Sequence, residues 1–236
     1  MMDVGAWRHV FKLDPNKPLS DAALEAVCES GTDAIVIGGT DGVTFDNTVE
    51  LLARVRRYAV PCVQEISSLE AVAPGFDGYL VPLVLNARDP DWLLRPHVEA
   101  IRRLGRLIRW DELVVEGYIV LNPEAKVARL TQSDTALDAE MAAAYATLAE
   151  RLLSLPVVYL EYSGTRGDVA LVRRVRRALE RARLFYGGGV DDPEVAREMA
   201  RVADTVVVGN AVYTNLRGAL ATVAAVKETP VNAADA

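Results

Sequence analysis

Short apolar runs alternate with amphipathic stretches along most of this 236-residue chain. The run Ala34–Gly39 is apolar throughout, which is typical of a strand buried on both faces of a parallel sheet. His9–Leu13 is a shorter strand candidate that ends before Asp14-Pro15, because the proline prevents the strand from continuing. Further strands are predicted at 61–66, 79–85, 116–121, 157–162, 184–186 and 205–208.

Helical periodicity follows most of these strands. Ser20, Asp138 and Asp168 stand where a side chain can cap a helix by accepting from its free N–H groups, and either Thr44 or Asp46 can cap another. Other helices are expected at 89–107, 193–202 and 216–226. After Asp138 the apolar residues recur every three or four positions, which predicts a buried stripe. This stripe consists of Met141, Tyr145, Leu148, Leu152 and Leu155.

Two connections lack the helical pattern. Ser67–Phe76 is short and is interrupted by Pro74-Gly75, so we predict an irregular connection where a regular barrel has its third helix. Glu124–Thr135 is polar and aperiodic, which predicts a long loop over the mouth of the barrel.

Eight strands, each followed by a helix or its substitute, predict a (β/α)8 barrel. We expect residues 1–228 to form one domain, and the segment from Thr229 to residue 236 to be a disordered tail because it has nothing to bury. A doubly wound open sheet is the alternative. It is less favoured because it needs no eighth unit and usually carries its glycine-rich turn first.

Composition and charge narrow the functional classes. The net charge of -7 and the pI near 5.0 argue against nucleic acid as a partner, because such binding requires a basic surface. In so acidic a chain the arginines after Asp168 are interpreted as a solvated helix face. They are Arg173, Arg174, Arg176, Arg177 and Arg181.

Cysteine and histidine are scarce in this sequence. Two cysteines and two histidines are too few for a disulfide framework or a zinc site, which fits a reducing cytosol. The first ten residues lack the apolar core of a signal peptide, and no apolar run approaches the roughly 18 residues of a membrane span. We therefore expect a cytoplasmic protein.

Glycines follow the last two predicted strands. Gly187–Gly189 and Gly209-Asn210 end apolar runs, and Ser163-Gly164 adds a third turn beside them. Glycine leaves backbone N–H groups accessible to an anion, and barrels commonly place a phosphate site after strands seven and eight. A single glycine after a strand is more often an ordinary turn, but the paired occurrence favours a phosphate site.

Charged and hydroxyl side chains stand at other strand ends. Lys12 and Glu161 lie within apolar runs, where a charge is costly unless it has a partner or a function. Asp14 and Thr40 offer hard oxygen ligands of the kind that hold magnesium together with a substrate diphosphate. Asp14, next to Pro15, can equally be a turn residue. These residues indicate a barrel enzyme that acts on a small phosphorylated substrate with magnesium.

Five motifs carry a more specific pattern. They are Phe11-Lys12-Leu13-Asp14-Pro15, Gly38-Gly39-Thr40-Asp41-Gly42-Val43-Thr44, Tyr159-Leu160-Glu161-Tyr162-Ser163-Gly164, Tyr186-Gly187-Gly188-Gly189 and Val208-Gly209-Asn210-Ala211. With their spacing, from about Asp3 to Lys227, they resemble the geranylgeranylglyceryl phosphate synthase family, and most closely its bacterial branch, PcrB.

The resemblance implies a modified (β/α)8 barrel with an extended connection in place of the third helix, in agreement with Ser67–Phe76. It implies a magnesium-dependent prenyltransferase. Such an enzyme transfers a long polyprenyl group, expected to be heptaprenyl, from polyprenyl diphosphate to the sn-3 hydroxyl of sn-glycerol 1-phosphate, which forms an ether and releases diphosphate. The resemblance also implies a homodimer. The lipid substrate and product would require at most transient contact with a membrane surface.

The resemblance also implies a role for single residues. Asp14 and Thr40 would serve the magnesium ion and the diphosphate, although the bacterial branch commonly has serine where Thr40 stands. Glu161 is the candidate that orients the glycerol hydroxyl and takes its proton. Ala100 and Ala87 are small residues beside the expected prenyl groove. Glycerol 1-phosphate would be bound by Lys12, Tyr159, Leu160, Glu161, Tyr162, Ser163, Gly164, Gly189, Gly209 and Asn210.

Two other functions stay open at this point. Another phosphate-binding barrel, such as an isomerase or lyase of tryptophan or histidine biosynthesis, would use the same glycine turns without magnesium. A non-enzymatic glycerophosphate-binding subunit would bind ligand without turnover. The placement of Lys12, Asp14 and Glu161 at one mouth speaks against the second.

Overall fold

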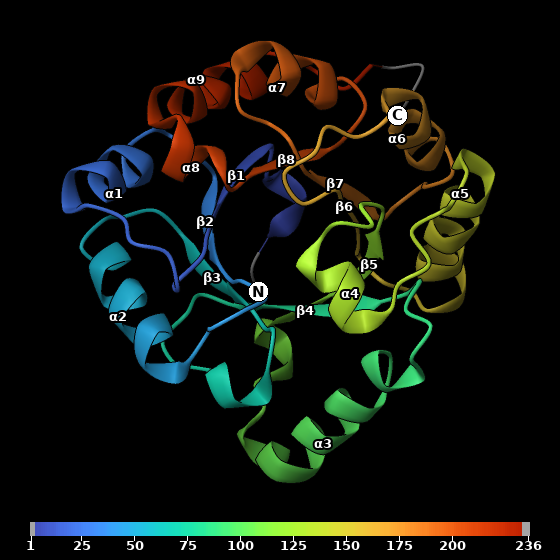
Figure 1. The fold of residues 1–236 in the computed structure, drawn as a ribbon. Helices are drawn as coiled ribbons and strands as arrows, with labels where there is room; N and C mark the ends of the chain where they lie inside the picture. The colour runs from blue at the N-terminus through green and yellow to red at the C-terminus, as the bar shows by residue number, and fades with distance from the viewer. Residues whose placement is uncertain (1–2, 233–236) are drawn as a thin grey trace.

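The computed structural model of the protein describes residues 3–232 and contains a closed eight-stranded barrel (Figure 1). All neighbouring strands are parallel, and β8 pairs with β1 to close the sheet. The predicted (β/α)8 fold is confirmed. The strands are β1 His9–Leu13, β2 Ala34–Ile37, β3 Cys62–Glu65, β4 Tyr79–Val84, β5 Leu113–Val120, β6 Val157–Glu161, β7 Arg183–Gly187 and β8 Thr205–Val208.

Helices surround the barrel, and local capping fixes where they begin. Ser20, Asp138 and Asp168 each accept from a backbone N–H of the helix that follows, as predicted, and Thr44 rather than Asp46 is the cap of its helix. None of the helices in the described range is long and apolar enough to cross a membrane. The α-helices are α1 Asp21–Cys28, α2 Phe45–Val55, α3 Arg95–Leu104, α4 Lys126–Thr131, α5 Ala139–Thr147, α6 Val169–Arg176, α7 Pro193–Ala200, α8 Ala211–Thr214 and α9 Leu216–Lys227.

Six shorter helical segments complete the structure. The predicted helix over 89–107 is divided into η3, α3 and η4, and Gly105, with a positive φ of 49°, ends α3. The strand expected to begin at Glu116 begins earlier, at Leu113. The short segments are η1 Val4–Ala6, η2 Leu69–Ala71, η3 Pro90–Trp92, η4 Gly105–Leu107, η5 Trp110–Glu112 and the π-helical η6 Leu148–Leu152.

The apolar core has two layers. One lies between the sheet and the helices, and the other fills the inside of the barrel. The inner layer contains Val10, Val36, Leu80 and Phe185 from four different strands. Trp7, which precedes β1, packs against Phe185 with ring centroids 6.3 Å apart. The segment before β1 therefore contributes to the packing inside the barrel.

The ring of helices is incomplete beside β4. The connection between β3 and β4 contains only the short η2, so the prediction of an irregular connection is confirmed. In Figure 1, α3 stands at the outer edge of the molecule, apart from the other helices. Tyr79, Val81 and Leu83 on the outer face of β4 are consequently only half-buried, whereas β2 and β3 are buried at every position.

The face by which α5 packs differs from the predicted stripe. Met141, Leu148 and Leu152 are 52%, 38% and 75% exposed, so the prediction that they lie inside was wrong. Small residues occupy the inner face instead, because the helix approaches the sheet closely: a Cβ on Gly117 of β5 would lie only 2.9 Å from the Cβ of Ala149. The buried residues are Ala142, Ala143, Ala146 and Ala149.

The segment over the mouth of the barrel is a short helix and not the predicted long loop. Helix α4 lies in front of the barrel opening in Figure 1. Ala125 and Ala128 pack with the interior side chains of the barrel, and Thr131 is buried with them. Lys126 forms an ion pair of 2.7 Å with Asp41, which follows β2. Tertiary contacts thus order a segment whose sequence lacks an amphipathic pattern.

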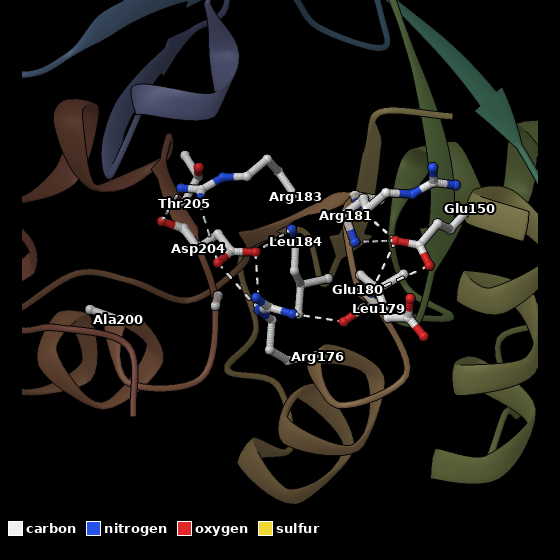
Figure 2. Close-up of polar contacts among 12 residues, drawn as sticks. Glu150, Arg176, Leu179, Glu180, Arg181, Arg183, Leu184, Ala200, Asp204 and Thr205 are labelled. Atoms are coloured by element: carbon white, nitrogen blue, oxygen red, sulfur yellow. Dashed lines mark hydrogen bonds and ion pairs between the residues drawn. The ribbon is translucent and has the colours of Figure 1, made fainter. Parts of the chain in front are cut away.

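Polar groups connect β7 with its neighbours (Figure 2). Asp204 accepts from the Leu184 N–H at 2.8 Å and pairs with Arg176 at 3.1 Å. Glu150 accepts from the backbone N–H groups of three successive residues, 180–182. The Ala182 nitrogen lies 2.7 Å from Glu150 Oε1. Arg176 belongs to the arginine run interpreted as solvated, and its side chain is only 12% exposed. That interpretation was wrong for this one residue.

The described part of the expected tail is held against the barrel. The carbonyl of Thr229 accepts from the Arg8 guanidinium at 2.7 Å, and the Asn232 N–H donates to the carbonyl of Arg201. Residues 229–232 therefore have contacts that the sequence did not indicate. The rest of the expected tail, residues 233–236, lies outside the described residues.

His9 is buried between the sheet and α9, and both of its ring nitrogens form hydrogen bonds. Its Nδ1 and Nε2 each lie 2.9 Å from a threonine hydroxyl, those of Thr32 and Thr222. Burial lowers the pKa of His9 from 6.5 to about 3. The folded protein therefore keeps this ring neutral over a pH range in which the unfolded chain binds a proton.

We predict that His9 makes the fold sensitive to acid. Between pH 6.5 and about 3 the unfolded state binds the extra proton, so the free energy of unfolding falls with decreasing pH by up to about 1.4 kcal/mol per pH unit. His9→Gln should show a shallower decline in urea titrations over this range. An equal slope in both proteins would contradict a neutral, buried ring.

Candidate active site

A cavity of about 1360 Å³ opens at the carboxyl ends of the strands. Its walls include Glu65 and Glu161, which end β3 and β6, and Lys12, the last residue but one of β1. The cavity also continues sideways, because Val81 and Val115 line it from the outer faces of β4 and β5. One continuous space therefore joins a charged chamber inside the barrel to an apolar groove beside it.

Lys12 is the cation of the chamber. Its ammonium group donates to Glu65 Oε1 at 2.6 Å and lies 5.9 and 5.6 Å from the ring centroids of Tyr118 and Tyr159. Burial opposes the charge, but the carboxylates of Glu65 and Glu161 outweigh burial and raise the pKa of Lys12. The side chain is thus held as a cation, with N–H donors left for a ligand beyond the one that Glu65 accepts.

Glu161 lies at the end of β6 and is only 7% exposed. Its Oε2 accepts from the Tyr118 hydroxyl at 2.7 Å, and its Oε1 accepts from both the N–H and the hydroxyl of Ser163. Three donors therefore fix the direction of this carboxylate. Only one donor of the described residues reaches Oε2, so this oxygen keeps a lone pair with which it can still accept from a ligand in the cavity.

Tyr118 and Tyr159 form an aromatic pair beside these charges. Their rings stack with centroids 4.7 Å apart and planes 17° from parallel. Burial, followed by the charge of Glu161, raises the pKa of both hydroxyls well above 10, so both stay protonated. The sequence reasoning included Tyr159 and missed Tyr118, although a polar group in an apolar strand was the signal that identified Glu161.

Glu116 is a second residue that the sequence reasoning missed. It is fully buried, and neither carboxyl oxygen has a hydrogen-bond partner in the described part of the chain. Lys12, Glu65 and Glu116 come from β1, β3 and β5, and alternate strands share a layer inside barrels of this kind. Burial, followed by repulsion from Glu65, raises the pKa of Glu116 well above 4.5. Folding therefore favours the protonated, neutral form of this carboxyl.

Backbone donors gather on the opposite side of the chamber. Three loops, those after β6, β7 and β8, contribute N–H groups that donate to no acceptor within residues 3–232. They belong to Gly164, Gly189, Gly209 and Asn210, which all line the cavity. Unpaired N–H groups that converge on one space are suited to bind a phosphate. The structure thus brings together the three glycine turns that the sequence singled out.

Close contacts require glycine at the end of β7 and in the loop that follows it. A Cβ on Gly187 would lie 2.1 Å from the Tyr159 hydroxyl oxygen. Gly189 has a φ of 58°, and a Cβ there would lie 2.4 Å from the Arg166 backbone nitrogen. Gly209 has no contact as short as these. The glycines after β7 therefore let the strand end and the loop after β6 approach each other.

Two predicted residues of the β6 motif face away from the cavity. Leu160 and Tyr162 belong to the core layer between the sheet and the helices. A Cβ on Gly167 would lie 2.5 Å from the Tyr162 ring, which packs against that loop. Only the backbone of these two residues can reach a ligand. Tyr159, Glu161, Ser163 and Gly164 line the cavity.

Asp14 and Thr40 lie together at the rim of the chamber. Both line the cavity, and a Cβ on the intervening Gly39 would lie 2.7 Å from Asp14 Oδ1. Asp14 Oδ1 accepts from the Asn16 N–H, which is the turn role that the sequence left open, while Oδ2 has no hydrogen-bond partner among the described residues.

These two residues fit a magnesium ion held mainly by a substrate. No cluster of three or more His, Cys, Asp or Glu side chains within residues 3–232 could hold a metal by itself. Magnesium commonly takes one or two carboxylates from a protein and completes its octahedral shell with substrate phosphates and water. A carboxylate and a hydroxyl at the rim meet that requirement.

The lateral groove is apolar. Leu69, Val72 and Pro74 line it from the connection that replaces the third helix, and further side chains come from α3 and η4. Ala100 is among the residues of α3 that line the groove, whereas Ala87 packs against the interior core and forms a bridge with Ser133. The groove starts at the charged chamber and passes over β4 toward the outside.

Relatives of this chain cover nearly its whole length. A family model described as the PcrB family matches residues 2–227. The chain is 58% identical over 228 residues to the heptaprenylglyceryl phosphate synthase of Geobacillus kaustophilus. This match covers 97% of this chain and 95% of the relative. It is 60% identical over 229 residues to the protein of the same name from Brevibacillus brevis. That match covers 97% of this chain and 99% of the relative.

A solved structure has the same fold. The (S)-3-O-geranylgeranylglyceryl phosphate synthase of Thermoplasma acidophilum, crystallised in complex with sn-glycerol-1-phosphate, superimposes with a TM-score of 0.84. The match covers 97% of this chain and all of the other, at 24% sequence identity. At this identity the likeness supports the barrel architecture.

We predict that Glu116→Gln stabilises the protein at alkaline pH. A carboxyl whose pKa is raised by folding keeps a proton that the unfolded chain releases, so the wild-type free energy of unfolding falls as pH rises above 4.5. The loss is up to about 1.4 kcal/mol per pH unit until the folded pKa is reached. Glutamine removes this loss, so the variant should gain in stability relative to wild type between about pH 5 and about pH 8.

The measurement is the urea midpoint of both proteins at the two pH values. Glu140→Gln, an exposed carboxylate paired with Arg174, serves as the control and should show no such gain. If the difference between Glu116→Gln and wild type is independent of pH, the carboxyl is not protonated in the folded protein.

Proposed function

The chain belongs to the PcrB family, and from this premise we propose that it is a prenyltransferase that makes heptaprenylglyceryl phosphate. It transfers a heptaprenyl group from the diphosphate donor to the sn-3 hydroxyl of sn-glycerol 1-phosphate, with release of diphosphate. The observation that carries the proposal is the identity of 58% and 60% to heptaprenylglyceryl phosphate synthases over nearly the full length of both chains. This membership decides against the unrelated phosphate-binding barrels and the non-enzymatic binder.

The acceptor fits the charged chamber. The free N–H groups of Gly164, Gly189, Gly209 and Asn210 are suited to its phosphate, since an anion needs converging donors. Lys12 supplies further donors from the other wall. Tyr159 and Ser163 line the same space. Glycerol 1-phosphate would then lie with its free hydroxyl groups toward the tyrosine pair and Glu161.

Glu161 is the proposed general base. It takes the proton of the sn-3 hydroxyl as that oxygen forms a bond to the first carbon of the prenyl group. The bond from this carbon to the diphosphate oxygen breaks, and the diphosphate leaves with the electron pair. The donors Tyr118 and Ser163 support this role because they fix the carboxylate in one orientation.

Asp14 and Thr40 are the proposed ligands of magnesium at the rim. When bound there, the ion would neutralise negative charge on the leaving diphosphate. Asp14 offers Oδ2, while its Oδ1 is used in the turn to Asn16. Thr40 offers its hydroxyl, so the ligand type matches the serine that is common at this position in the bacterial branch.

The prenyl tail fits the lateral groove. The groove begins beside the rim residues Asp14 and Thr40 and is lined by apolar side chains of the connection before β4 and of α3. A tail placed there would cover the half-buried outer positions of β4. Ala100 faces the groove, so a larger side chain at this position would shorten it.

The homodimer follows from the resemblance alone, and the cytoplasmic location follows from the composition of the sequence. A homodimer, a cytoplasmic location and a single domain over residues 1–228 stay predictions. The single domain is supported by the closure of one barrel from all eight strands, without a linker between them.

We predict that the wild-type protein, incubated with sn-glycerol 1-phosphate, magnesium and a series of prenyl diphosphates, forms an ether-linked product with the long donor. Glu161→Gln should lower kcat by about a hundredfold or more, since a positioned base contributes that much. Binding of glycerol 1-phosphate should be largely retained. Glu194→Gln, an exposed glutamate of α7, is the matched control. Near-normal turnover by Glu161→Gln would remove Glu161 from the role of base.

We predict that Thr40→Val weakens the response to magnesium. Loss of one of two protein ligands should raise the magnesium concentration for half-maximal activity by about tenfold. Thr147→Val, on α5 and away from the cavity, is the control. An unchanged metal titration would show that Thr40 is only a turn residue.

A further inference from the structure

Three carboxyl oxygens inside the barrel have no hydrogen-bond donor among the described residues. Glu65 Oε1 accepts from Lys12, but its Oε2 is buried and has no partner. Both oxygens of the fully buried Glu116 are in the same condition. Buried polar groups in native proteins nearly always have a partner, because an unpaired one is costly. Two ionised carboxylates cannot satisfy each other, since both only accept.

The strand registers place these two carboxyl groups in one layer with Lys12. On β3, the residue paired with Lys12 through β2 is Val63, and Glu65 lies two residues beyond it. On β5, the residue paired with Glu65 through β4 is Val114, and Glu116 again lies two residues beyond it. The strands of such a barrel are tilted by about 36° to its axis, so side chains at one height are offset along the sheet. The equal offset from β1 to β3 and from β3 to β5 is what a single layer requires.

The charges that surround Glu116 are not balanced. Burial, followed by repulsion from Glu65, raises its pKa well above 4.5. Arg183 of β7 does not compensate, because it donates to the Trp7 carbonyl and pairs with Asp204. Among the described residues, the titratable groups that face Glu116 are one cation, two carboxyl groups and two phenols. They are Lys12 of β1, Glu65 of β3, Tyr118 of β5, and Tyr159 and Glu161 of β6.

One proton held between the two carboxyl groups satisfies both of them. A protonated carboxyl has an O–H that donates, and a carboxylate oxygen accepts from it. Two carboxyl groups that occupy one site cannot both ionise, so such pairs hold a single proton between them. Glu65 Oε1 already accepts from Lys12, so Oε2 is the acceptor and Glu116 the donor.

We propose that Glu65 and Glu116 share one proton, and that this carboxyl pair positions Lys12 for the anionic acceptor. Glu65 then accepts from Glu116 with one oxygen and from Lys12 with the other, so the ammonium group keeps its remaining donors for the phosphate. The proton also keeps a further negative charge out of a chamber that receives an anion. Glu116 itself does not line the cavity, so it acts through Glu65 and is a positioning residue. The role in binding rests on the proposed function, whereas the shared proton does not.

Infrared spectroscopy of the wild-type protein without substrate tests the shared proton. The C=O stretch of a protonated carboxyl should appear at pH 7, where exposed carboxyl groups are ionised, and it should be missing in Glu116→Gln. Glu65→Gln should shift or remove this band, because it changes the partner of the proton. A wild-type spectrum without the band, or a band that Glu65→Gln leaves unchanged, would overturn the proposal.

Calorimetric titration with glycerol 1-phosphate tests the positioning of Lys12. Glu116→Leu leaves Glu65 Oε2 without a donor, so Glu65 turns both oxygens toward Lys12 and withdraws its N–H groups from the ligand. We expect the dissociation constant of this variant to rise by about tenfold. Glu116→Gln should bind like wild type at pH 7, because its amide N–H still donates to Glu65. Val114→Ala, two residues earlier on the inner face of β5, is the matched control for loosened packing and should also bind like wild type.

The pH dependence links the two measurements. Above its folded-state pKa, Glu116 loses the proton and the chamber gains a negative charge, so the wild-type dissociation constant should rise over the same pH range in which the infrared band disappears. Glu116→Gln shares Lys12 and both tyrosines with wild type, so an equal rise in this variant would overturn the role of Glu116. A Glu116→Leu variant that binds as tightly as Glu116→Gln would overturn it as well, because the side chain would then only fill space.

Turnover separates the carboxyl pair from the proposed function. Wild type that shows the band and the expected binding but forms no prenyl ether would contradict the prenyltransferase function alone. Turnover by wild type without the band would contradict the shared proton alone. If the band is present and wild type does not bind glycerol 1-phosphate, the proposed acceptor and the role of the pair in its binding both fail.

Discussion

A single cation has to balance three carboxyl groups inside a closed barrel, and the arrangement of the chamber follows from that constraint. Lys12 neutralises Glu65, with which it shares a hydrogen bond of 2.6 Å. The hydroxyl of Tyr118 and the donors of Ser163 stabilise the charge of Glu161. Glu116 has no such partner within the described residues, and its burial favours the protonated form. Of the three carboxyl groups, Glu161 is thus the one with donors of its own at the wall of the cavity, which is what a base for a bound hydroxyl requires.

The sequence predicted the strands and most helix starts correctly, because burial on both faces leaves continuous apolar runs and caps depend on adjacent residues only. Lys12 and Glu161 were found because each interrupts such a run near its end. Glu116 was missed because the strand was taken to begin there, whereas tertiary pairing extends β5 back to Leu113. A local pattern cannot fix where a strand begins when its first residues are paired only through the barrel.

Small residues account for most of the other differences. Bulky apolar residues at helical spacing suggested the inner face of α5, but alanines pack there because the sheet comes close at Gly117. The segment around α4 looked like a loop because the two side chains that it buries in the interior core are the alanines Ala125 and Ala128, with Val127 packed beside them. Side chains this small contribute little to an apolar pattern, yet they determine how near two elements can approach.

The missing third helix leaves part of the sheet without a protein cover. On the outer face of β4 and β5, Val81 and Val115 line the groove and are only half-buried, because no helix packs over them. A prenyl tail in the groove would complete this layer of the core. A ligand that binds only the folded state stabilises it by an amount that grows with the ligand concentration, so the resistance of the protein to unfolding and proteolysis would rise and fall with the supply of its lipid donor.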